Sequence, residues 1–537
     1  MAPPPRLKTC TLQLTLHQTV LPLRVFLGAC EGGNILVFPT EGSHWINMDI
    51  LLQALHSRGH NITIVRSDKS WYIKDKSTYY RSFTVEVKRS LDQKYITELV
   101  SKAILFERGA LPLTNFLHMT LGMFSTFVDA HMAVGEFVSA MLSDQELMRT
   151  LRDSKFDLVL TDPCWGGGVI LAKYLNLPLV YNVRWLIAGE AHLAIAPSPL
   201  SYIPITGSGN TDKMTFFQRV KNVFLHLVTQ TQHHLVVRQV YQKICDKYLG
   251  PDNDYHQLML DADIWLMRVD FVFEFPRPTM PNAVYMGGFQ CKPAKPLPED
   301  LEEFVQSSGE HGVIIMSLGT FVSQLPADIT NEIAATFAKL PQKVIWRHKG
   351  EKPATLGNNT LLVDWMPQND LLGHPKTKLF VAHGGTNGVQ EAIYHGVPVV
   401  GLPLFFDQYD NLLRLKERGG AELLTIKTVD KDNNFLKAIQ KVLDDTAYRM
   451  NMQRLSRLHR DQPMKPMDTA LFWIEFVKRH KGAAHLKTEA YRLAWYSYYS
   501  LDVFLFLAGA LLLVLLTTFI LMRCLYTTVC KQKVKRD

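Results

Sequence analysis

The chain has 537 residues and a mass of 61.2 kDa, and its 47% hydrophobic and 20% charged residues are ordinary for a packed globular protein. This composition excludes a disordered chain, a collagen and a coiled coil. The formal net charge is +8, with 58 Lys and Arg against 50 Asp and Glu and no dense basic stripe, so we expect no nucleic-acid partner.

The seven cysteines are too few for a disulfide scaffold in a chain of this size. None forms a Cys-x-x-Cys pair, so the sequence predicts no metal site. We expect thiols at Cys164, Cys245 and Cys291, and the sequence leaves open one disulfide among these three.

Residues 1–30 have the outline of a signal peptide, because Arg6 and Lys8 precede an apolar stretch that ends at the small residues Gly28 and Ala29. Polar residues interrupt that stretch at Gln13, His17, Gln18 and Arg24. The sequence therefore predicts a weak signal peptide.

Residues 31–290 are expected to form a first α/β domain. Strand-like runs and helical spacings alternate, with strands at 34–39 and 60–66 around a helix at 46–58, and strands at 157–161 and 178–182 around a helix at 167–175. Residues 92–150 look mostly helical and irregular. Repeated strand–helix–strand units indicate a parallel sheet with right-handed crossovers.

A second domain is expected at 301–460, after a stiff linker at 291–300 that contains three prolines. Its predicted strands are 313–317, 343–347, 379–382 and 397–401, and its predicted helices are 327–340, 387–395 and 408–418. Helices should follow at 461–500. The fold class is therefore α/β, with two doubly wound domains that face each other across a cleft.

Residues 503–522 are 20 residues without a charge, and a helix of that length spans about 30 Å, the thickness of a bilayer core. Trp495, Tyr496, Tyr498 and Tyr499 precede it as an interfacial aromatic belt. The tail at 523–537 is basic, so the sequence predicts a single transmembrane helix, a cytosolic tail and a body outside the cytosol.

Two further signals concern the cellular address. Lys533 and Lys535 stand at the fifth and third positions from the end, respectively, and resemble a dilysine retrieval signal of the endoplasmic reticulum; a merely basic flank is the alternative. The sequons at Asn61 and Asn358 suit a lumenal body, and Asn358 is the better glycosylation candidate because Asn61 enters a predicted strand.

The strand at 379–382 runs into His383, Gly384, Gly385, Asn387 and Gly388, and a helix follows. Glycines let the backbone approach a ligand closely, and a helix N-terminus offers N–H groups to an anion. This arrangement predicts a diphosphate site. Trp365 could stack on a base, Gln368 could read the edge of that base, and Glu391 could bind ribose hydroxyls.

The stretch from Trp365 to Asn411, WMPQNDLLGHPKTKLFVAHGGTNGVQEAIYHGVPVVGLPLFFDQYDN, closely resembles the donor-binding signature of the UDP-glycosyltransferases, and within them of the vertebrate-type UDP-glucuronosyltransferases. The resemblance extends over nearly the whole chain beyond residue 33 and includes GSHW at 42–45 and DQPMKPMD at 461–468. It implies the GT-B type fold, with an acceptor-binding first domain and a donor-binding second domain.

The resemblance also implies residue roles. Trp365 and Gln368 would contact uracil, with Arg347 near the uridine, and Glu391 would bind the ribose. The diphosphate would be held by Ser317, His383, Gly384, Gly385, Asn387 and Gly388, and the donor sugar by Asp407 and Gln408.

His44 follows the first strand, and Asp162 closes another strand of the same sheet, so both should face the cleft. A lone histidine is more often structural, but Asp162 could hold the His44 ring and stabilise its imidazolium form. In the family resembled, the matching positions are the catalytic base and its orienting acid.

The expected activity is transfer of glucuronic acid from UDP-glucuronic acid, as co-substrate, to a hydroxyl of a small lipophilic acceptor, with inversion and with no other cofactor. Arg268 is a candidate contact for the sugar carboxylate; a structural arginine is the alternative. The acceptor pocket is expected to use aromatic and apolar residues, namely Trp71, Tyr72, Phe106, Phe116, Met119, Phe124, Phe127 and Trp185, although such residues are more often core.

Two alternatives remain: a UDP-glucose- or UDP-galactose-dependent transferase, and a non-catalytic lipid- or UDP-sugar-binding membrane protein. Self-association in the bilayer, as a homo- or hetero-oligomer, is an expectation from the family only. The run Gly166-Gly167-Gly168 departs from ordinary composition, and we expect it to loosen or reshape the wall near the acceptor.

Overall fold

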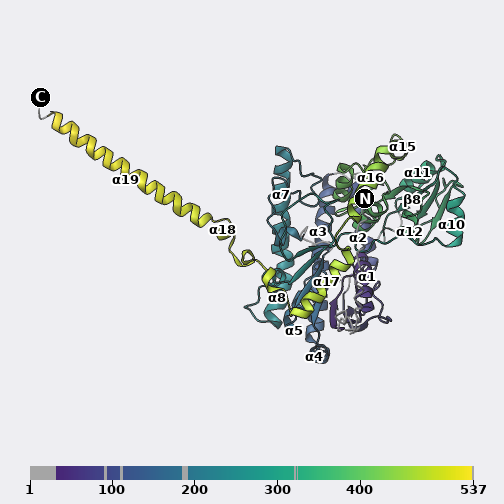
Figure 1. Cartoon of the computed structure of the whole chain (residues 1–537), viewed down its shortest axis with the longest axis horizontal. Coiled ribbons are helices and arrows are strands. Elements are labelled where there is room, and N and C mark those ends of the chain that lie inside the picture. The colour runs from purple at the N-terminus through teal and green to yellow at the C-terminus, as the bar shows by residue number, and fades with distance from the viewer. Residues whose placement is uncertain are drawn as a thin grey trace, which may run out of the picture.

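The computed structural model describes residues 32–89, 93–108, 113–183, 191–319, 322 and 325–534, so the predicted signal peptide at 1–30 lies outside the described residues. Two parallel sheets form a body from which one long helix projects (Figure 1). The predicted α/β fold with two doubly wound domains is confirmed.

The first sheet has seven strands in the order β3-β2-β1-β4-β5-β6-β7, all parallel. Its strands are β1 (Asn34–Phe38), β2 (Asn61–Ser67), β3 (Arg81–Val85), β4 (Leu158–Thr161), β5 (Leu179–Val183), β6 (Ile264–Met267) and β7 (Ala283–Tyr285). The helices of this half are α1 (Ser43–Ser57), α2 (Gln93–Arg108), α3 (Leu113–Ser143), α4 (Gln145–Asp153), α5 (Gly167–Leu175), α6 (His192–Ile195), α7 (Phe216–Gln232), α8 (Arg238–Tyr248) and α9 (Tyr255–Leu260), with the π-helical turn η1 (His233–Val237) joining α7 to α8.

Side chains of β1 alternate between two buried clusters, because successive strand residues point to opposite faces. Leu36 and Phe38 pack with α3, α4, α5, α8 and α9, whereas Ile35 and Val37 pack with α1 and with a helix near the C-terminus, α17 (Pro466–His480). The first sheet is therefore covered by helices on both faces, as a parallel sheet requires.

The second sheet has six parallel strands in the order β10-β9-β8-β11-β12-β13. Its strands are β8 (Val313–Ser317), β9 (Lys343–Arg347), β10 (Thr360–Val363), β11 (Thr377–Ala382), β12 (Val399–Gly401) and β13 (Ala421–Leu423). Its helices are α10 (Glu299–Gln306), α11 (Ala327–Ala338), α12 (Gln368–Leu372), α13 (Thr386–His395), α14 (Gln408–Glu417), α15 (Asn434–Asp444) and α16 (Thr446–Arg460).

Two helices cross between the halves. The side chains of Val100, Ala103 and Ile104 on α2 join a buried cluster of the second sheet, although α2 lies within the first half of the sequence. In the other direction, α17 packs against α1, β6 and β7 of the first sheet. The two domains are therefore joined by the chain between them and also by α2 and α17, each of which packs against the sheet of the other domain.

After α17 the chain passes through η2 (Ala484–Leu486), η3 (Glu489–Arg492) and α18 (Trp495–Tyr498) into α19 (Leu501–Val534). The segment Leu501–Val529 is long and apolar enough to cross a membrane, and none of its most apolar window is buried in the body. It contains the predicted span at 503–522. Lys535 lies outside the described residues, and the Lys533 side chain is not described.

In each sheet the strand order reverses at one place. From β1 the chain moves outward to β2 and β3 and then returns to form β4 on the other side of β1, and the second sheet repeats this around β8 and β11. Ligands of doubly wound sheets bind outside the carboxyl ends of the strands at this switch point. The two switch points therefore determine where a site can lie.

The glycine run before and within α5 tightens the wall of the first domain, so the expectation of a looser wall is wrong. A Cβ atom added to Gly166, Gly167 or Gly168 would lie 2.6 Å from Tyr241 Cγ, 2.4 Å from Phe38 Cζ and 2.2 Å from Thr161 Oγ1, respectively. These positions require glycine because aromatic rings and strand β4 approach the backbone closely.

We expect Gly167→Ala to destabilise the protein by about 1–3 kcal/mol, because the new methyl group would force the Phe38 ring out of its buried position. Thermal unfolding of the detergent-solubilised protein measures this. The matched control is Gly122→Ala in α3, where an added Cβ meets nothing within 4 Å. Equal unfolding temperatures for both variants would contradict the packing role.

Candidate active site between the two sheets

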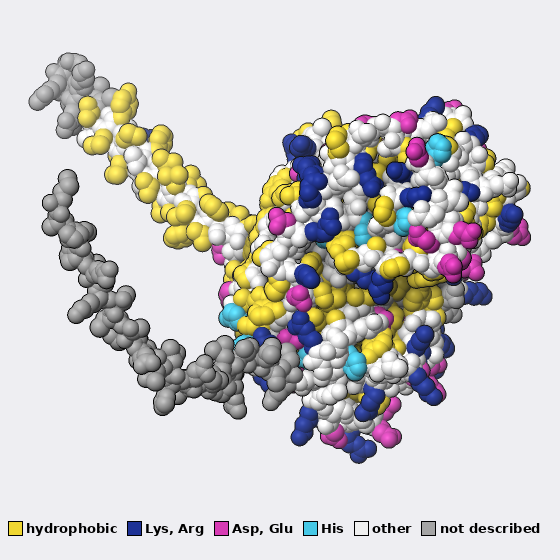
Figure 2. All heavy atoms as spheres, turned by 45° about the vertical axis from the view of Figure 1, so that its right-hand side comes forward, with side chains coloured by type: hydrophobic (Ala, Val, Ile, Leu, Met, Phe, Trp, Pro, Cys, Tyr) yellow, Lys and Arg dark blue, Asp and Glu magenta, His cyan; other side chains and the backbone are white. Residues whose placement is uncertain are grey.

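A cavity of about 1350 Å³ lies between the two domains and is lined by residues of both. Figure 2 shows hydrophobic side chains gathered in a groove across the middle of the body. On the first-domain side the lining includes His44, after β1, and on the second-domain side it includes Ser317 and His383, which end β8 and follow β11. The cavity therefore joins the two switch points.

The structure brings His44 and Asp162 together. His44 stands in the first turn of α1, Asp162 follows β4, and His44 Nδ1 lies 2.6 Å from Asp162 Oδ2. The other carboxylate oxygen of Asp162 accepts the backbone N–H of Cys164 at 2.8 Å. The His44 side chain is 16% exposed and that of Asp162 is 4% exposed, so the pair has one side open to the cavity.

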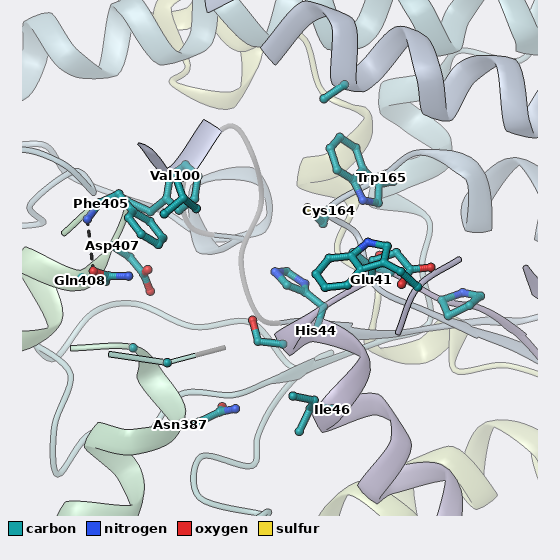
Figure 3. Close-up of a pocket in the computed structure, with 18 of the residues that line it drawn as sticks. Glu41, His44, Ile46, Val100, Cys164, Trp165, Asn387, Phe405, Asp407 and Gln408 are labelled. Atoms are coloured by element: carbon teal, nitrogen blue, oxygen red, sulfur yellow. Dashed lines mark hydrogen bonds between the residues drawn. The ribbon is translucent and has the colours of Figure 1, made fainter. Parts of the chain in front are cut away.

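This geometry suits general-base chemistry. Because Nδ1 of His44 is engaged by the carboxylate, Nε2 is the ring nitrogen left for a ligand in the cavity. Figure 3 shows the His44 ring pointing into the cavity between Trp165 on one side and Asn387 and Asp407 of the second domain on the other. A hydroxyl group held there would lie between His44 and the second domain.

Around β11, glycines make room for the His383 ring. A Cβ atom on either Gly319 or Gly385 would lie 2.5 Å from His383 Nε2. Gly384 has a φ of 90° and packs against α14 instead of lining the cavity, so its role is in the turn. Helix α13 begins after Gly385 without a side-chain cap, which leaves its first-turn N–H groups for an anion.

Glu391 of α13 pairs with Gln368 of α12, whose Nε2 donates to Glu391 Oε2 at 2.6 Å. Burial raises the pKa of Glu391 to about 7; the Gln368 hydrogen bond and the charge of Lys292 oppose this rise, whereas the charge of Asp370 adds to it. A carboxyl in this state needs further donors to be stable as an anion, and ribose hydroxyls would supply them.

Trp365 is 67% exposed beside the cavity, and the Arg347 guanidinium lies 5.6 Å from its ring centroid. Arg347 also donates to the Gly319 carbonyl. This cation–π contact leaves a large part of the indole surface open, where a planar base can stack.

Asp407 and Gln408 start α14 at the edge of the cavity. Gln408 Oε1 accepts the backbone N–H of Leu404 at 2.8 Å. It also accepts the backbone N–H of Phe405 at 3.2 Å (Figure 3). Asp407 Oδ2 accepts from Asn411 Nδ2 at 2.9 Å. These bonds fix both side chains at the edge of the cavity, beside the start of α13.

Arg268 is not among the cavity-lining residues, so the structure does not place it as a direct contact of a sugar carboxylate. Its side chain is 4% exposed, and its Nη2 donates to Asn387 Oδ1 at 2.6 Å. Arg268 reaches the cavity through Asn387, whose amide it orients.

The family model for "UDP-glucoronosyl and UDP-glucosyl transferase" matches residues 33–536. The chain belongs to this family. Among its relatives, UDP-glucuronosyltransferase 2A2 of Mus musculus is 42% identical over 518 residues, which cover 95% of each chain. UDP-glucuronosyltransferase 2B13 of Oryctolagus cuniculus is 41% identical over 522 residues, which cover 95% of this chain and 96% of that one.

Solved glycosyltransferases share the fold at low identity. The calicheamicin glycosyltransferase CalG4 is 19% identical with a TM-score of 0.55, over 84% of this chain and 99% of that chain. A UDP-glucosyltransferase from Polygonum tinctorium is 15% identical with a TM-score of 0.53, over 83% and 99%. These likenesses confirm the predicted GT-B type fold of this transferase.

The acceptor side of the transferase cavity only partly matches the aromatic residues predicted for it. Trp71, Phe124 and Phe127 line the cavity, whereas Tyr72 packs against the buried cluster that contains Trp45. Trp185 lies outside the described residues, and the side chains of Phe106, Phe116 and Met119 are not described.

Sequence reasoning missed several lining residues, including Glu41, Arg66, Phe137, Trp165, Phe224 and Leu227. Glu41 lies three positions before His44, accepts the Tyr72 N–H at 3.1 Å, and has a pKa raised by burial. Its position directly after β1, before the predicted base, was the signal that could have found it. Phe224 and Leu227 on α7 carried no such signal, because helical spacing does not show which face meets a cavity.

The cysteines predicted as thiols are thiols: Cys164, Cys245 and Cys291 form no disulfide. Among the described residues, one group of side chains has ligand atoms close enough to hold a metal ion, namely His44, Asp162 and Cys164, within 4.8 Å of one another. In the structure the first two of these side chains are already joined by their hydrogen bond.

We expect Glu391→Gln to stabilise the ligand-free transferase at pH 8. The folded-state pKa of Glu391, about 7, exceeds the ordinary value of 4.5. Ionising this carboxyl therefore lowers the free energy of unfolding as the pH rises from about 4.5 through 7. The gain should be up to about 3 kcal/mol at pH 8 and less than about 1 kcal/mol at pH 5.

Chemical denaturation at both pH values measures this difference, with Glu417→Gln, an exposed glutamate of α14, as the matched control. A stability change that is the same at pH 5 and pH 8 would show that the Glu391 carboxyl is well solvated.

Proposed function

We propose that this protein is a membrane-bound UDP-glucuronosyltransferase. It would move glucuronic acid from UDP-glucuronic acid to a hydroxyl of a small lipophilic acceptor and give the β-glucuronide. The observation that carries the proposal is the His44–Asp162 pair, 2.6 Å apart, in the same cavity as the glycine-flanked His383 loop and the start of α13.

The reaction would be a single displacement. His44 Nε2 takes the proton of the acceptor hydroxyl as its oxygen bonds to the anomeric carbon and the bond from that carbon to the diphosphate oxygen breaks. Asp162 holds the ring and stabilises the imidazolium that forms. Attack opposite the leaving group inverts the α-linked donor.

The second domain would bind the donor. Ser317, His383, Asn387 and Gly388 line the cavity at the α13 N-terminus, where the diphosphate charge would be stabilised as UDP leaves. Trp365 would stack on uracil, Gln368 would contact its edge, and Glu391 would accept from the ribose hydroxyls. Asp407 and Gln408 would bind the sugar.

For the choice of glucuronic acid, support comes from the relatives, which at 41–42% identity over 95% of the chain are named UDP-glucuronosyltransferases. Lys292 and Arg347 also line the second-domain side of the cavity and would attract an anionic sugar, with the acidic Asp370, Glu391 and Asp407 nearby in the same lining. The family description includes UDP-glucosyl transferases, so a hexosyltransferase is the competing function.

For the cellular site, we infer an endoplasmic reticulum membrane protein with a lumenal body and a cytosolic tail. The apolar α19, the basic residues after it and the dilysine pattern at Lys533 and Lys535 support this topology. Asn358 and Asn61 are both exposed, but Asn61 starts β2 and donates to Asn34 Oδ1 at 3.1 Å, which favours Asn358 as the glycan carrier. Loss of mass on endoglycosidase H treatment would check the lumenal location.

The proposed function is tested in permeabilised microsomes that contain the full chain. Phenols and steroids are offered with UDP-glucuronic acid, UDP-glucose or UDP-galactose, and products are identified by mass spectrometry. A glucuronide supports the proposal. A hexose adduct alone would overturn the donor assignment, and absence of product with every donor would favour a binding protein.

In the same assay, His44→Ala and Asp162→Asn should each lower kcat by about 10²–10⁴. The KM for the UDP-sugar should change little, because both residues belong to the first domain. His56→Ala, an exposed histidine at the other end of α1, is the matched control and should keep full turnover. Full turnover by His44→Ala would refute the proposed base.

A further inference from the structure

The first-domain side of the cavity contains a group of polar side chains that the reaction described above does not use. This group, here called the polar corner, consists of Thr40, Glu41, Arg66, Ser67 and Ser70, which all line the cavity. Most other lining residues of the first domain are apolar, among them Phe38, Val65, Ile73, Val87 and Phe137. Polar groups placed in an apolar pocket are what fixes the orientation of a ligand.

Two adjacent strands bring the polar corner together and place it near His44. Thr40 and Glu41 follow β1, Arg66 and Ser67 end β2, and the two strands pair in parallel, so their carboxyl ends share one edge. Glu41 lies three positions before His44, so the two Cα atoms are at most about 11 Å apart. Figure 3 shows Glu41 on the His44 side of the cavity, across from Asp407.

The Glu41 carboxyl is held in place but only partly stabilised as an anion. Its Oε2 accepts the Tyr72 N–H at 3.1 Å. Burial raises the pKa of Glu41, although hydrogen bonds from the Ser70 side chain and from the Tyr72 and Trp71 backbone, together with the charge of Arg66, oppose the rise. An ionised carboxylate offers about four acceptor positions, so one more donor from a ligand would stabilise it further.

Two buried polar atoms of the polar corner have no hydrogen-bond partner among the described residues, namely Thr40 Oγ1 and Arg66 Nε. Thr40 is 8% exposed and Arg66 is 7% exposed. The other nitrogens of Arg66 are engaged, since Nη1 donates to Thr84 Oγ1 at 3.2 Å and Nη2 donates to the Ser70 carbonyl at 3.3 Å. Buried polar atoms are nearly always paired in folded proteins, so this corner has hydrogen-bonding capacity left for a ligand.

The charges of the polar corner decide which ligand group fits it. A carboxyl, Glu41, and a guanidinium, Arg66, lie together, and Asp75 Oδ1 lies 3.6 Å from Arg66 Nη1. An anionic group would be repelled by Glu41 and Asp75, and an ammonium group would be repelled by Arg66. A neutral hydroxyl both donates and accepts, so it can donate to Glu41 and accept from its other neighbours.

We propose that the polar corner is a specificity site for aromatic diols, in which Glu41 accepts a hydrogen bond from a second hydroxyl of the acceptor while the first hydroxyl faces His44. The role of the first hydroxyl rests on the proposed function. Binding of the second hydroxyl requires no turnover.

Pairs of acceptors that differ in one hydrogen-bond donor test this site. Hydroquinone is compared with 4-methoxyphenol, and 2,7-dihydroxynaphthalene with 7-methoxy-2-naphthol, in permeabilised microsomes with UDP-glucuronic acid. Each ether keeps one reacting hydroxyl, but its second oxygen cannot donate. Counted per hydroxyl, kcat/KM should be about tenfold higher for the diol than for its ether in at least one pair, as expected for a hydrogen bond to a charged group.

Variants of Glu41 show whether this residue causes the preference. Glu41→Gln should lower the ratio of diol to ether about fivefold, because an amide oxygen is a weaker acceptor than a carboxylate, and Glu41→Met should abolish the preference. Loss of support for the Tyr72 loop alone would slow both acceptors equally and leave the ratio unchanged. Glu86→Gln, an exposed glutamate outside the cavity lining, is the matched control and should keep the ratio. An unchanged ratio in both Glu41 variants would overturn the site.

Calorimetric titration separates this site from the proposed function. The detergent-solubilised full chain, with UDP present, should bind the diol about tenfold more tightly than the ether, and Glu41→Gln should lose most of that difference. Preferential binding without turnover of either acceptor would refute the proposed transferase function and leave the site intact. Equal affinities for diol and ether in both pairs would refute the site.

Discussion

The whole site depends on one geometric constraint: a parallel sheet places the carboxyl ends of its strands along a single edge. In both domains the strand order reverses next to the first strand, so the crevice at β1 and β4 faces the crevice at β8 and β11. His44 and Asp162 are 118 positions apart, yet they meet because β1 and β4 are neighbours. The helices α2 and α17, which cross between the domains, hold the two edges against each other.

A second constraint is the cost of burying charge at these edges. Burial raises the pKa of Glu41 on the acceptor side and of Glu391 on the donor side, so each carboxyl is held where its anion lacks full solvation. A substrate with hydroxyl donors would replace the missing water, and part of its binding free energy would come from relieving that cost. The buried Arg268 follows the same principle, because its hydrogen bond to Asn387 gives its charge a partner and fixes that amide at the cavity.

Much of this architecture was predictable from sequence because buried parallel strands are continuous apolar runs. The predicted strands 313–317 and 343–347 coincide with β8 and β9, and 157–161 differs from β4 by one residue. Short strands such as β6, β7 and β13 were missed, since a run of three or four residues is too short to show a period. Motif residues such as His383 and Glu391 were found because their spacing encodes a strand, a turn and a helix. The position of Trp165 in the cavity wall and the packing of α2 against the second sheet were not predicted, because tertiary packing alone decides which neighbours these residues meet.

Helix α7 shows where such reasoning stops in principle. A period of 3.6 residues identifies which side chains share a face, but the usual step of turning the apolar face inward assumes that water is the only surroundings. Here the buried polar residue of α7 is Asn222, with three hydrogen bonds, while apolar side chains of the same helix such as Phe217 and Phe224 are exposed. The residues Phe224, Leu227, Val228 and Leu235 line the cavity, so this face of α7 meets the cavity and is not simply the solvent side of an amphipathic helix.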